Sequence, residues 1–516
     1  MSLEIAASDL AIEENLERFL LVLSVSLSVA TLPQVFSWFR QIPYTLLLVI
    51  VGACLALVDV RLVNLSPELI LSIFLPPLLF EAAWNLKWSH LKANLFPITL
   101  YAIVGVIISI LGIGFGLYQI VHLPLAIALL IGASLSATDP VSVIALFREL
   151  GVGERPKTLL EGESLFNDGV AVVAFSLLVG IPLGLKTFEL QGTIVSFAVV
   201  VGLGIGIGSL IGFGISYLTQ RFDLPLVEQS LTLVSAYGTY LITEKLGGSG
   251  VIAVVTVGLV LGNFGSRIGM NPRTRVIVSE FWDFLAFFVN SIVFLLIGDQ
   301  IHFSSLRDNL DSIAITIVAM IVTRAIAVYG LGLLSNQVVT EGTTWQEQTA
   351  IWWGGLRGSV SIALALSVPI ELAGREEIIA TVFGVVLFTL LAQGLTMKGV
   401  LSALGLLGDL PIQQEYDQTI ARRTALNRVL SYLKTIEHRP DLEEDFYAYQ
   451  MRLLEGELET LENRLEDLRQ KYPQLKDYAQ EQLRNELLAI EADTYAEFVR
   501  SGQLNKELAP FLQNLL

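Results

Sequence analysis

Long apolar runs dominate the chain up to about residue 404. A window of about 19 residues finds thirteen of them, near residues 18–37, 43–58, 66–84, 94–121, 123–147, 158–183, 191–218, 225–243, 250–264, 276–300, 310–335, 345–369 and 376–404. A helix of about 20 residues spans a bilayer and satisfies its own backbone hydrogen bonds there. Only 16% of the residues are charged, against about 25% in soluble domains. The sequence therefore predicts an all-α polytopic membrane protein with about 13 transmembrane helices.

The basic residues of the loops predict the orientation of these helices. One set of loops holds Arg40, Lys87, Lys92, Arg148, Arg155, Lys157, Arg221, Arg267, Arg273, Arg275 and Lys398, and the other holds Arg18, Arg61, Lys186, Lys245, Arg307 and Arg375. The richer set is expected to face the cytoplasm. Because an odd number of spans separates the two ends of the chain, we expect the N-terminus outside and the C-terminus in the cytoplasm.

Charge and composition exclude several classes of function. The formal net charge of −17 argues against binding to nucleic acid. A single cysteine, Cys54, cannot form an intrachain disulfide, and the four histidines are scattered along the chain. We therefore expect neither a redox centre nor a cysteine or histidine metal site, and no resident cofactor.

Two carboxylates lie inside apolar runs, where a charge is costly. Asp139 is followed by Pro140, which breaks the helix and frees backbone carbonyls that can bind a cation. Asp168 shares one predicted helix face with Ser164 and Asn167, because their spacings are three and four residues. This oxygen-rich face suits a hard cation such as Na+ or Li+. The alternative is a structural polar contact between helices, but intramembrane carboxylates usually serve an ion path.

A second interruption lies in the twelfth run, where Gly354, Gly355 and Gly358 surround Arg357. It lies seven spans after the break at Asp139, and this odd offset would invert the second repeat relative to the first in the membrane. Two interrupted spans at corresponding places predict an inverted-repeat transporter with its site near the middle of the bilayer. A chance pairing is the alternative, since Gly and Pro are common in membrane helices.

Three further charges lie where lipid is expected. Arg324 and Arg357 fall within long apolar runs, and Glu81 follows a Pro76-Pro77 break. An arginine keeps its charge, so each needs a carboxylate or carbonyl partner. Glu163 is a candidate partner for one of them. Alternatively, each arginine only holds helices together and does not contact an ion.

Two other patterns have structural interpretations. Gly204, Gly208 and Gly212 are spaced by four residues inside an apolar run. That spacing predicts close helix packing and not a dinucleotide-binding loop, which would need a preceding strand. Asp299 faintly resembles an intramembrane aspartyl protease motif, but the pattern is incomplete and Asp299 is expected to mark the end of a span.

The composition changes near residue 409, which divides the chain into a transmembrane domain (1–408) and a helical C-terminal domain (409–516). About a third of the residues are charged after this point. A leucine seam predicts an amphipathic helix that ends at Tyr472-Pro473, and its members are Leu454, Leu458, Leu461, Leu465 and Leu468. A second helical pattern follows. The seam is short, so packing within the chain is favoured over pairing with a second copy.

Five ordered motifs resemble the bacterial sodium/proton antiporters related to the animal sodium/proton exchangers. They are RQIPYTLLL from Arg40, FLPPLLFEAAW, SATDPVSV, EGESLFNDGVAVV and GGLRGSVSIALAL, over residues 40 to 369. The resemblance implies a homodimer in a bacterial plasma membrane, with thirteen helices per protomer in a six-helix core domain and an interface domain. It covers the membrane part and leaves the role of the tail open.

The same resemblance implies roles for individual residues. Asp168 would bind the cation and the proton, and Asp139 would act beside it through water. The rest of the ion shell would come from Ser164, Glu81 and the carbonyl of Thr138. Asn167 would pair with Glu163, and Arg324 would bridge Glu163, with Arg357 as the alternative. Because electrogenic relatives carry two aspartates where this chain has Asn167-Asp168, exchange is expected to be electroneutral.

These expectations predict a secondary transporter and not an enzyme. In this transporter, one Na+ and one H+ would compete for Asp168. A K+/H+ or Ca2+/H+ antiporter on the same scaffold is the closest alternative, because ion choice depends on cavity size and ligand count. A cation channel is a remote one, since it would need a continuous pore.

Overall fold

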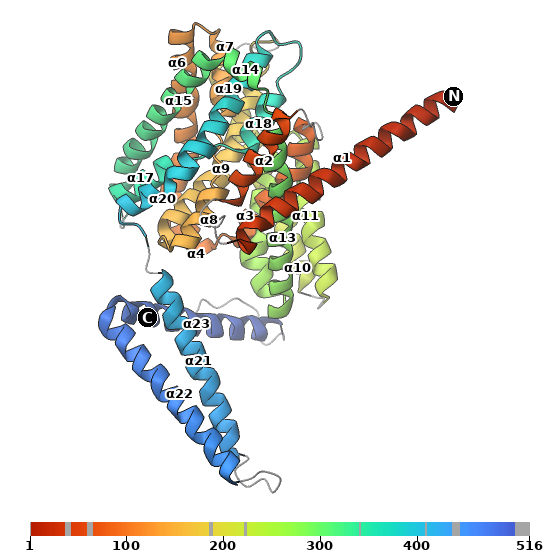
Figure 1. Ribbon diagram of the computed structural model, residues 1–516. Helices are drawn as coiled ribbons and strands as arrows, with labels where there is room; N and C mark the ends of the chain where they lie inside the picture. The colour runs from red at the N-terminus through yellow and green to blue at the C-terminus, as the bar shows by residue number, and fades with distance from the viewer. Residues whose placement is uncertain are drawn as a thin grey trace. The chain divides into compact units, whose positions relative to one another are not determined.

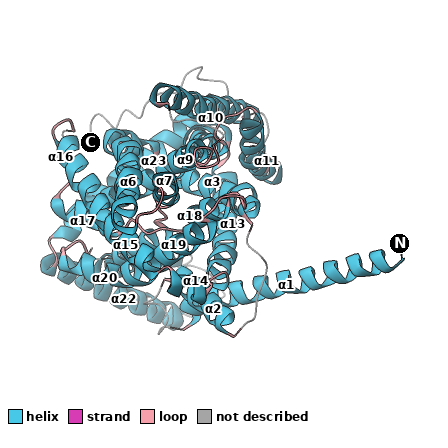
Figure 2. Ribbon diagram, turned by 90° about the horizontal axis from the view of Figure 1, so that it is seen from above, coloured by secondary structure: helices cyan, strands magenta, loops and turns pink. Residues whose placement is uncertain are grey.

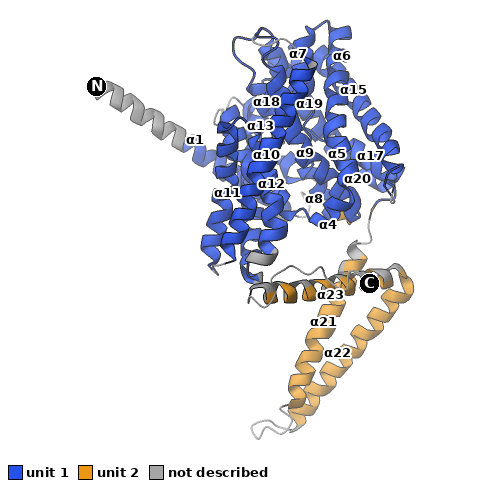
Figure 3. Cartoon of the chain, turned by 180° about the vertical axis from the view of Figure 1, so that it is seen from behind, with its two compact units in different colours: residues 1–148, 152–406 blue, residues 149–151, 407–516 orange. Residues whose placement is uncertain are grey.

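The chain folds into helices joined by short loops (Figures 1 and 2). A computed structural model describes residues 2–36, 43–58, 66–184, 189–220, 224–339, 342–407, 410–435 and 444–500. No strand occurs within these ranges. Four of the loop cations used for orientation, Arg40, Arg61, Lys186 and Arg221, lie outside them. Contacts divide the chain into one unit of residues 1–148 and 152–406, and a second of 149–151 and 407–516 (Figure 3).

The first half of the large unit contains Asp139, Asp168 and the first helix break. In chain order these are α1 (Ser2–Val35), α2 (Tyr44–Leu57), the π-helical segment η2 (Leu69–Phe74), α3 (Leu75–Asn85), α4 (Trp88–Ala93), α5 (Leu95–Leu100), η3 (Tyr101–Gly105), α6 (Val106–Gly116), η4 (Leu117–Val121), α7 (Leu125–Ser134), α8 (Val141–Leu150) and α9 (Glu154–Leu178). Helix α9 packs against α7, η3 and α12, so the segment that carries Asp168 lies among other helices.

The second half of this unit continues the bundle. Its elements are α10 (Leu190–Thr219), α11 (Pro225–Lys245), α12 (Gly250–Val260), η5 (Leu261–Gly269), α13 (Pro272–Asp299), α14 (Phe303–Asp308), α15 (Leu310–Ala325), η6 (Ile326–Gly330), α16 (Leu331–Asn336), α17 (Trp345–Trp353), α18 (Ser359–Leu366), α19 (Arg375–Phe388), η7 (Thr389–Gln393) and α20 (Gly394–Ala403). As expected, Asp299 ends a helix.

Each predicted apolar run falls largely on helical residues, but the runs differ in how well they qualify as spans. Among the described residues, five helical stretches are long and apolar enough to cross a membrane: Leu95–Val121, Gln191–Thr219, Arg273–Asp299, Leu310–Asn336 and Arg375–Ala403. Other runs fall on shorter helices or are divided by a break. The all-helical membrane architecture is therefore present, and the count of thirteen spans stays a prediction.

The two predicted interruptions both end helices. Between α7 and α8 the chain leaves the helix over residues 135–140, and between α17 and α18 it does so over 354–358. Pro140 supplies no N–H at the first break. At the second, Gly354, Gly355 and Gly358 lack the side chains that would collide with neighbouring atoms: a Cβ on Gly355 would meet the guanidinium of Arg324, and one on Gly358 would meet the carboxylate of Asp139.

The glycine stripe of α10 packs directly against α12, as its spacing predicts. A Cβ added to Gly204 would lie 2.9 Å from the carbonyl oxygen of Ser249, and one on Gly208 would lie 2.5 Å from that of Ala253. Gly212 meets Val260 in the same way. The stripe thus lets two helix backbones approach closely.

The small unit contains three helices: α21 (Leu410–Thr435), α22 (Glu444–Lys471) and α23 (Gln474–Arg500). Leu465 and Leu468 of the leucine seam are buried together with Tyr416 of α21 and Leu475 of α23. The seam therefore packs within the chain, as expected, but its main partner is α21, a helix that the seam alone did not reveal.

Candidate ion-binding site

The two helix breaks are hydrogen-bonded to each other. The backbone N–H of Asp139 donates to the carbonyl oxygen of Leu356 at 2.8 Å. The carboxylate of Asp139 accepts from the backbone N–H of Val141 at 3.1 Å. This bond partly satisfies the free N–H groups at the start of α8, where the helix dipole favours a negative charge. Asp139 therefore stabilises the conformation of the first break through its backbone and its side chain.

Arg357 fastens the second break to the first from a fully buried position. Its Nη1 donates to the carbonyl oxygens of Ser136 (3.0 Å) and Ala137 (2.8 Å). These carbonyls have lost their helical partners because the chain is unwound there, so the guanidinium replaces the missing donors. The Nε and Nη2 atoms have no hydrogen-bond partner among the described residues. Arg357 thus keeps a positive charge beside the two breaks.

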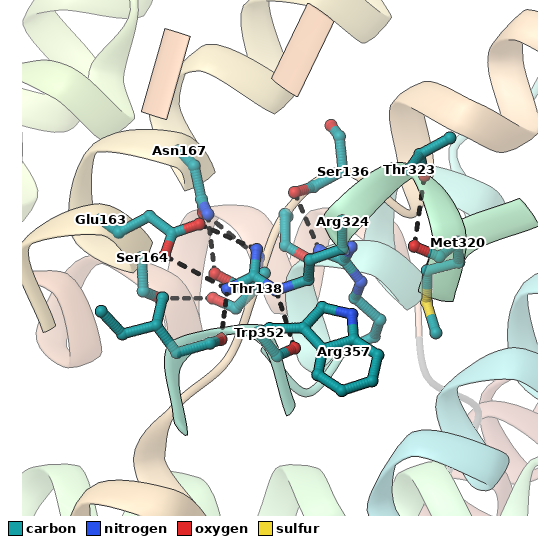
Figure 4. Close-up of polar contacts among 12 residues, drawn as sticks. Ser136, Thr138, Glu163, Ser164, Asn167, Met320, Thr323, Arg324, Trp352 and Arg357 are labelled. Atoms are coloured by element: carbon teal, nitrogen blue, oxygen red, sulfur yellow. Dashed lines mark hydrogen bonds and ion pairs between the residues drawn. The ribbon is translucent and has the colours of Figure 1, made fainter. Parts of the chain in front are cut away.

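Arg324 pairs with Glu163 through two parallel bonds (Figure 4). Nη1 donates to Oε1 at 2.8 Å and Nη2 to Oε2 at 3.1 Å, and both side chains are buried. Arg324 also donates to the carbonyl oxygens of Ile351 (3.0 Å) and Trp352 (3.3 Å) at the end of α17. Of the two arginines left open by the sequence, the structure places Arg324 on Glu163, which fixes α9 to α15 and α17.

Asn167 differs from its expected role. Arg324 occupies both oxygens of Glu163, and Asn167 instead contacts Thr138 twice. Its Nδ2 donates to Thr138 Oγ1 at 2.6 Å, and its Oδ1 accepts from the backbone N–H of Thr138 at 3.2 Å. The hydroxyl of Ser164 donates to the Thr138 carbonyl oxygen. Helix α9 therefore holds the first break by its peptide groups (Figure 4).

Asp168 lies at a cavity of about 230 Å³ that is lined by both polar and apolar side chains. Its Oδ1 is buried and has no hydrogen-bond partner among the described residues. Ser164, Asp139 and Glu81 also line this cavity, whereas Thr138 and Asn167 are outside its lining. Glu81 of α3 accepts a hydrogen bond from Asn85 at 2.7 Å. The cavity thus brings together four oxygen-bearing side chains from three parts of the chain.

Several cavity residues were not identified from the sequence. They include Tyr44, Asn85, Arg148, Glu161, Asn290 and Ser359. Asn290 is a polar residue inside an apolar run. The same signal pointed to Asp168, so it could also have pointed to Asn290. Ser359 follows the glycine-rich break directly. The others carry no local pattern, and only the packing of α2, α3, α8 and α9 brings them to the cavity.

A smaller cavity of about 10 Å³ lies on the other side of Asn167. The lining consists of Tyr101, Gly105, Val106, Ser109, Ser136, Glu163, Asn167, Arg324, Ala327 and Val328. A cavity of this size has room for about one water molecule. The layer of Asn167 and the first break therefore separates the large cavity from the small one.

Comparison with known proteins identifies close relatives. Residues 23–403 match the family model of the transmembrane sodium/hydrogen exchanger. The chain is 65% identical to the Na(+)/H(+) antiporter ApNhaP of Aphanothece halophytica, over 100% of this chain and 99% of that protein. It is 59% identical to the low-affinity Na(+)/H(+) antiporter NhaS1 of Synechocystis sp., over 98% and 97% of the two chains.

The fold also matches a solved structure. The sodium proton antiporter MjNhaP1 from Methanocaldococcus jannaschii superposes with a TM-score of 0.61 at 21% identity, over 74% of this chain and 99% of that one. At this identity the match concerns the fold alone.

Proposed function

Because the chain belongs to the sodium/hydrogen exchanger family, we propose that it exchanges Na+ for H+ across a membrane, with Asp168 as the group that binds either ion. It is an integral membrane protein of this family and a secondary transporter. The relatives are named for Na+ and H+, which favours Na+ over K+ or Ca2+ as the main cation. Li+ is expected to follow Na+, since oxygen ligands suit both.

One observation carries this proposal: the buried Oδ1 of Asp168 has no partner in the described part of the chain, and the side chain lines a cavity together with other oxygen-bearing side chains. An ionised carboxylate is costly at such a place unless a positive charge joins it. Either a proton or a cation can neutralise it, but both need the same oxygen atoms. Competition between them links the two fluxes.

The neighbours of Asp168 supply the remaining oxygen ligands. Ser164 and the Thr138 carbonyl are hydrogen-bonded to each other, and each oxygen keeps a lone pair that can turn to a cation. Glu81 and Asp139 line the same cavity and would contribute carboxylate oxygens to the cation. Asp139 would do so through a bridging water. Asn167 holds Thr138 in place, so its role is to position the carbonyl.

Charge balance makes this exchange electroneutral. One carboxylate carries one Na+ in one direction and one H+ in the other, so each half of the cycle moves a neutral site. Glu163 is paired with Arg324 and therefore adds no second titrating charge. Asn167 stands beside Asp168 where a second aspartate would carry another proton.

The proposed cycle is alternating access, in which one inverted repeat of a thirteen-helix bundle rocks against the other and exposes the site to each side of the membrane in turn. The large cavity reaches Asp168 from the side of Arg148 and Glu161, which the loop charges assign to the cytoplasm. The structure would thus correspond to an inward-facing state, in a bacterial plasma membrane, with the N-terminus outside and the C-terminus in the cytoplasm. A channel would need an open pore, whereas the layer of Asn167 and Thr138 lies behind Asp168.

We assign the helices after residue 409 to a cytoplasmic domain that regulates transport or stabilises a homodimer. Every proposed ion ligand precedes it in the chain, and α21, α22 and α23 have their own buried cluster. The bundle itself would contact membrane lipid.

The decisive experiment is a flux assay in proteoliposomes with Na+, Li+, K+ and Ca2+ in turn, on wild type and Asp168→Asn. We expect Na+- and Li+-dependent proton release from wild type, and loss of exchange in Asp168→Asn with unchanged thermal unfolding. The matched control Asp308→Asn alters an exposed aspartate and should retain full activity. Full exchange by Asp168→Asn would refute the site assignment.

A further inference from the structure

An ion pair stands at the mouth of the large cavity. Arg148, in the last turn of α8, lies 3.5 Å from Glu161 of α9, measured from Nη2 to Oε1. The exposed fractions of the two side chains are 57% and 21%. Both residues line the cavity that leads to Asp168. Solvent therefore reaches this pair before it reaches the buried site.

Glu161 shares a face of α9 with the proposed ion ligands. Ser164 and Asp168 follow it by three and seven residues, and all three side chains line the cavity. Seven residues of helix rise about 10 Å. A cation that enters from the mouth thus meets the carboxylate of Glu161 about two turns before that of Asp168.

Arg148 is the direct ion-pair partner of Glu161, and Lys157 adds a second positive charge that acts on the same carboxylate. Lys157, one turn earlier on α9, is paired with Glu154 at 3.4 Å. Among the described residues, Arg148 alone is within ion-pair distance of Glu161. Exposed ion pairs are weak, so a cation in the cavity can compete with Arg148 for the carboxylate.

We propose that Glu161 sets how readily the cation enters, and that Arg148 opposes it by masking its charge. This inference rests on the proposed Na+/H+ exchange and concerns a step before binding at Asp168. A carboxylate at the mouth of a cavity raises the local concentration of cations, and a guanidinium beside it lowers that concentration. Together the two residues determine the apparent affinity for Na+, while the turnover number depends on the buried site.

The test compares Glu161→Gln, Glu161→Asp and Arg148→Gln with wild type in proteoliposomes, and measures the apparent KM for Na+ and kcat separately. We expect Glu161→Gln to raise KM about threefold or more with little change in kcat. Glu161→Asp should restore most of the loss, because it retains the charge. Arg148→Gln should lower KM, since it unmasks Glu161.

Asp308→Asn is again the control, because Asp308 is exposed and lies outside the cavity lining. Added choline chloride should reduce the difference between wild type and Glu161→Gln, since salt screens exposed charges. A purely structural role for Glu161 would instead lower kcat or stability and show no such dependence on ionic strength.

Two failures can be told apart. If wild type shows no Na+/H+ exchange, the proposed function is wrong. If wild type exchanges and Glu161→Gln folds with an unchanged KM, the function stands and the role of Glu161 is refuted. A lower kcat at unchanged KM would also refute it.

Discussion

The backbone N–H of Asp139 donates to the carbonyl oxygen of Leu356, and this bond joins two helix breaks that are far apart in the sequence. The contact leaves no room for a side chain at Gly358, whose Cβ would collide with the carboxylate of Asp139. The close approach of Asp139 is therefore a sufficient reason for a glycine here.

Gly358→Ala is expected to displace Asp139 and to lose most of the transport activity, with a destabilisation of about 1–3 kcal/mol from overpacking. Flux in proteoliposomes and thermal unfolding in detergent measure the two effects. Gly399→Ala is the control, because this exposed helical glycine has open space at its Cβ position. Wild-type flux from Gly358→Ala would show that the breaks tolerate a shift of Asp139.

Turnover is expected to be independent of the membrane potential, because one proton replaces one Na+ at a single carboxylate. Valinomycin and K+ gradients can set the potential across proteoliposomes to several values. The initial rate of Na+/H+ exchange should be the same at each value. A rate that follows the imposed potential would mean that net charge moves in the cycle.

The buried pair of Glu163 and Arg324 is expected to matter for stability more than for ion binding. Removing one partner leaves an uncompensated buried charge, so Glu163→Gln or Arg324→Gln should each cost about 3–5 kcal/mol. The double substitution should cost less than the sum of the two. Unfolding of all four proteins completes a double-mutant cycle, and additive losses would show that the pair is not coupled.

Truncation after Leu407 is expected to leave Na+ binding intact, since every proposed ligand precedes that residue. The pH profile can still shift, because a cytoplasmic domain can favour one access state through differential contacts. The apparent Na+ affinity and the pH profile in vesicles measure the two effects. A truncated protein that folds but no longer binds Na+ would place part of the site in the tail.

The sequence predicted the helical architecture, and single polar groups in apolar runs pointed to Asp139 and Asp168, which both line the large cavity. Asp139, Asp168 and the two breaks are visible in this way because a charge or a helix-breaking residue is costly in a membrane. Close packing along the glycine stripe of α10 followed from glycine spacing, although its partner α12 did not. These are local patterns, which a single segment of sequence can display.

The pairings were harder to predict because they depend on where side chains from distant helices meet. Arg324 and Arg357 have equally unusual positions in sequence, yet Arg324 alone reaches Glu163, while Arg357 is committed to the carbonyls of Ser136 and Ala137. Asn167 was expected on Glu163 and instead contacts Thr138. In both cases the deciding fact is a tertiary contact with no sequence periodicity.

The bonds from Arg357 to the first break also constrain how the protein is made. Ser136 and Arg357 are 221 residues apart. The ribosome therefore synthesises the first break long before it synthesises Arg357, whose guanidinium satisfies the carbonyls of that break. Until then, the peptide groups at 135–140 must find water or other provisional partners during membrane insertion. The ion site is therefore assembled late in biosynthesis, when the second broken helix enters the bundle.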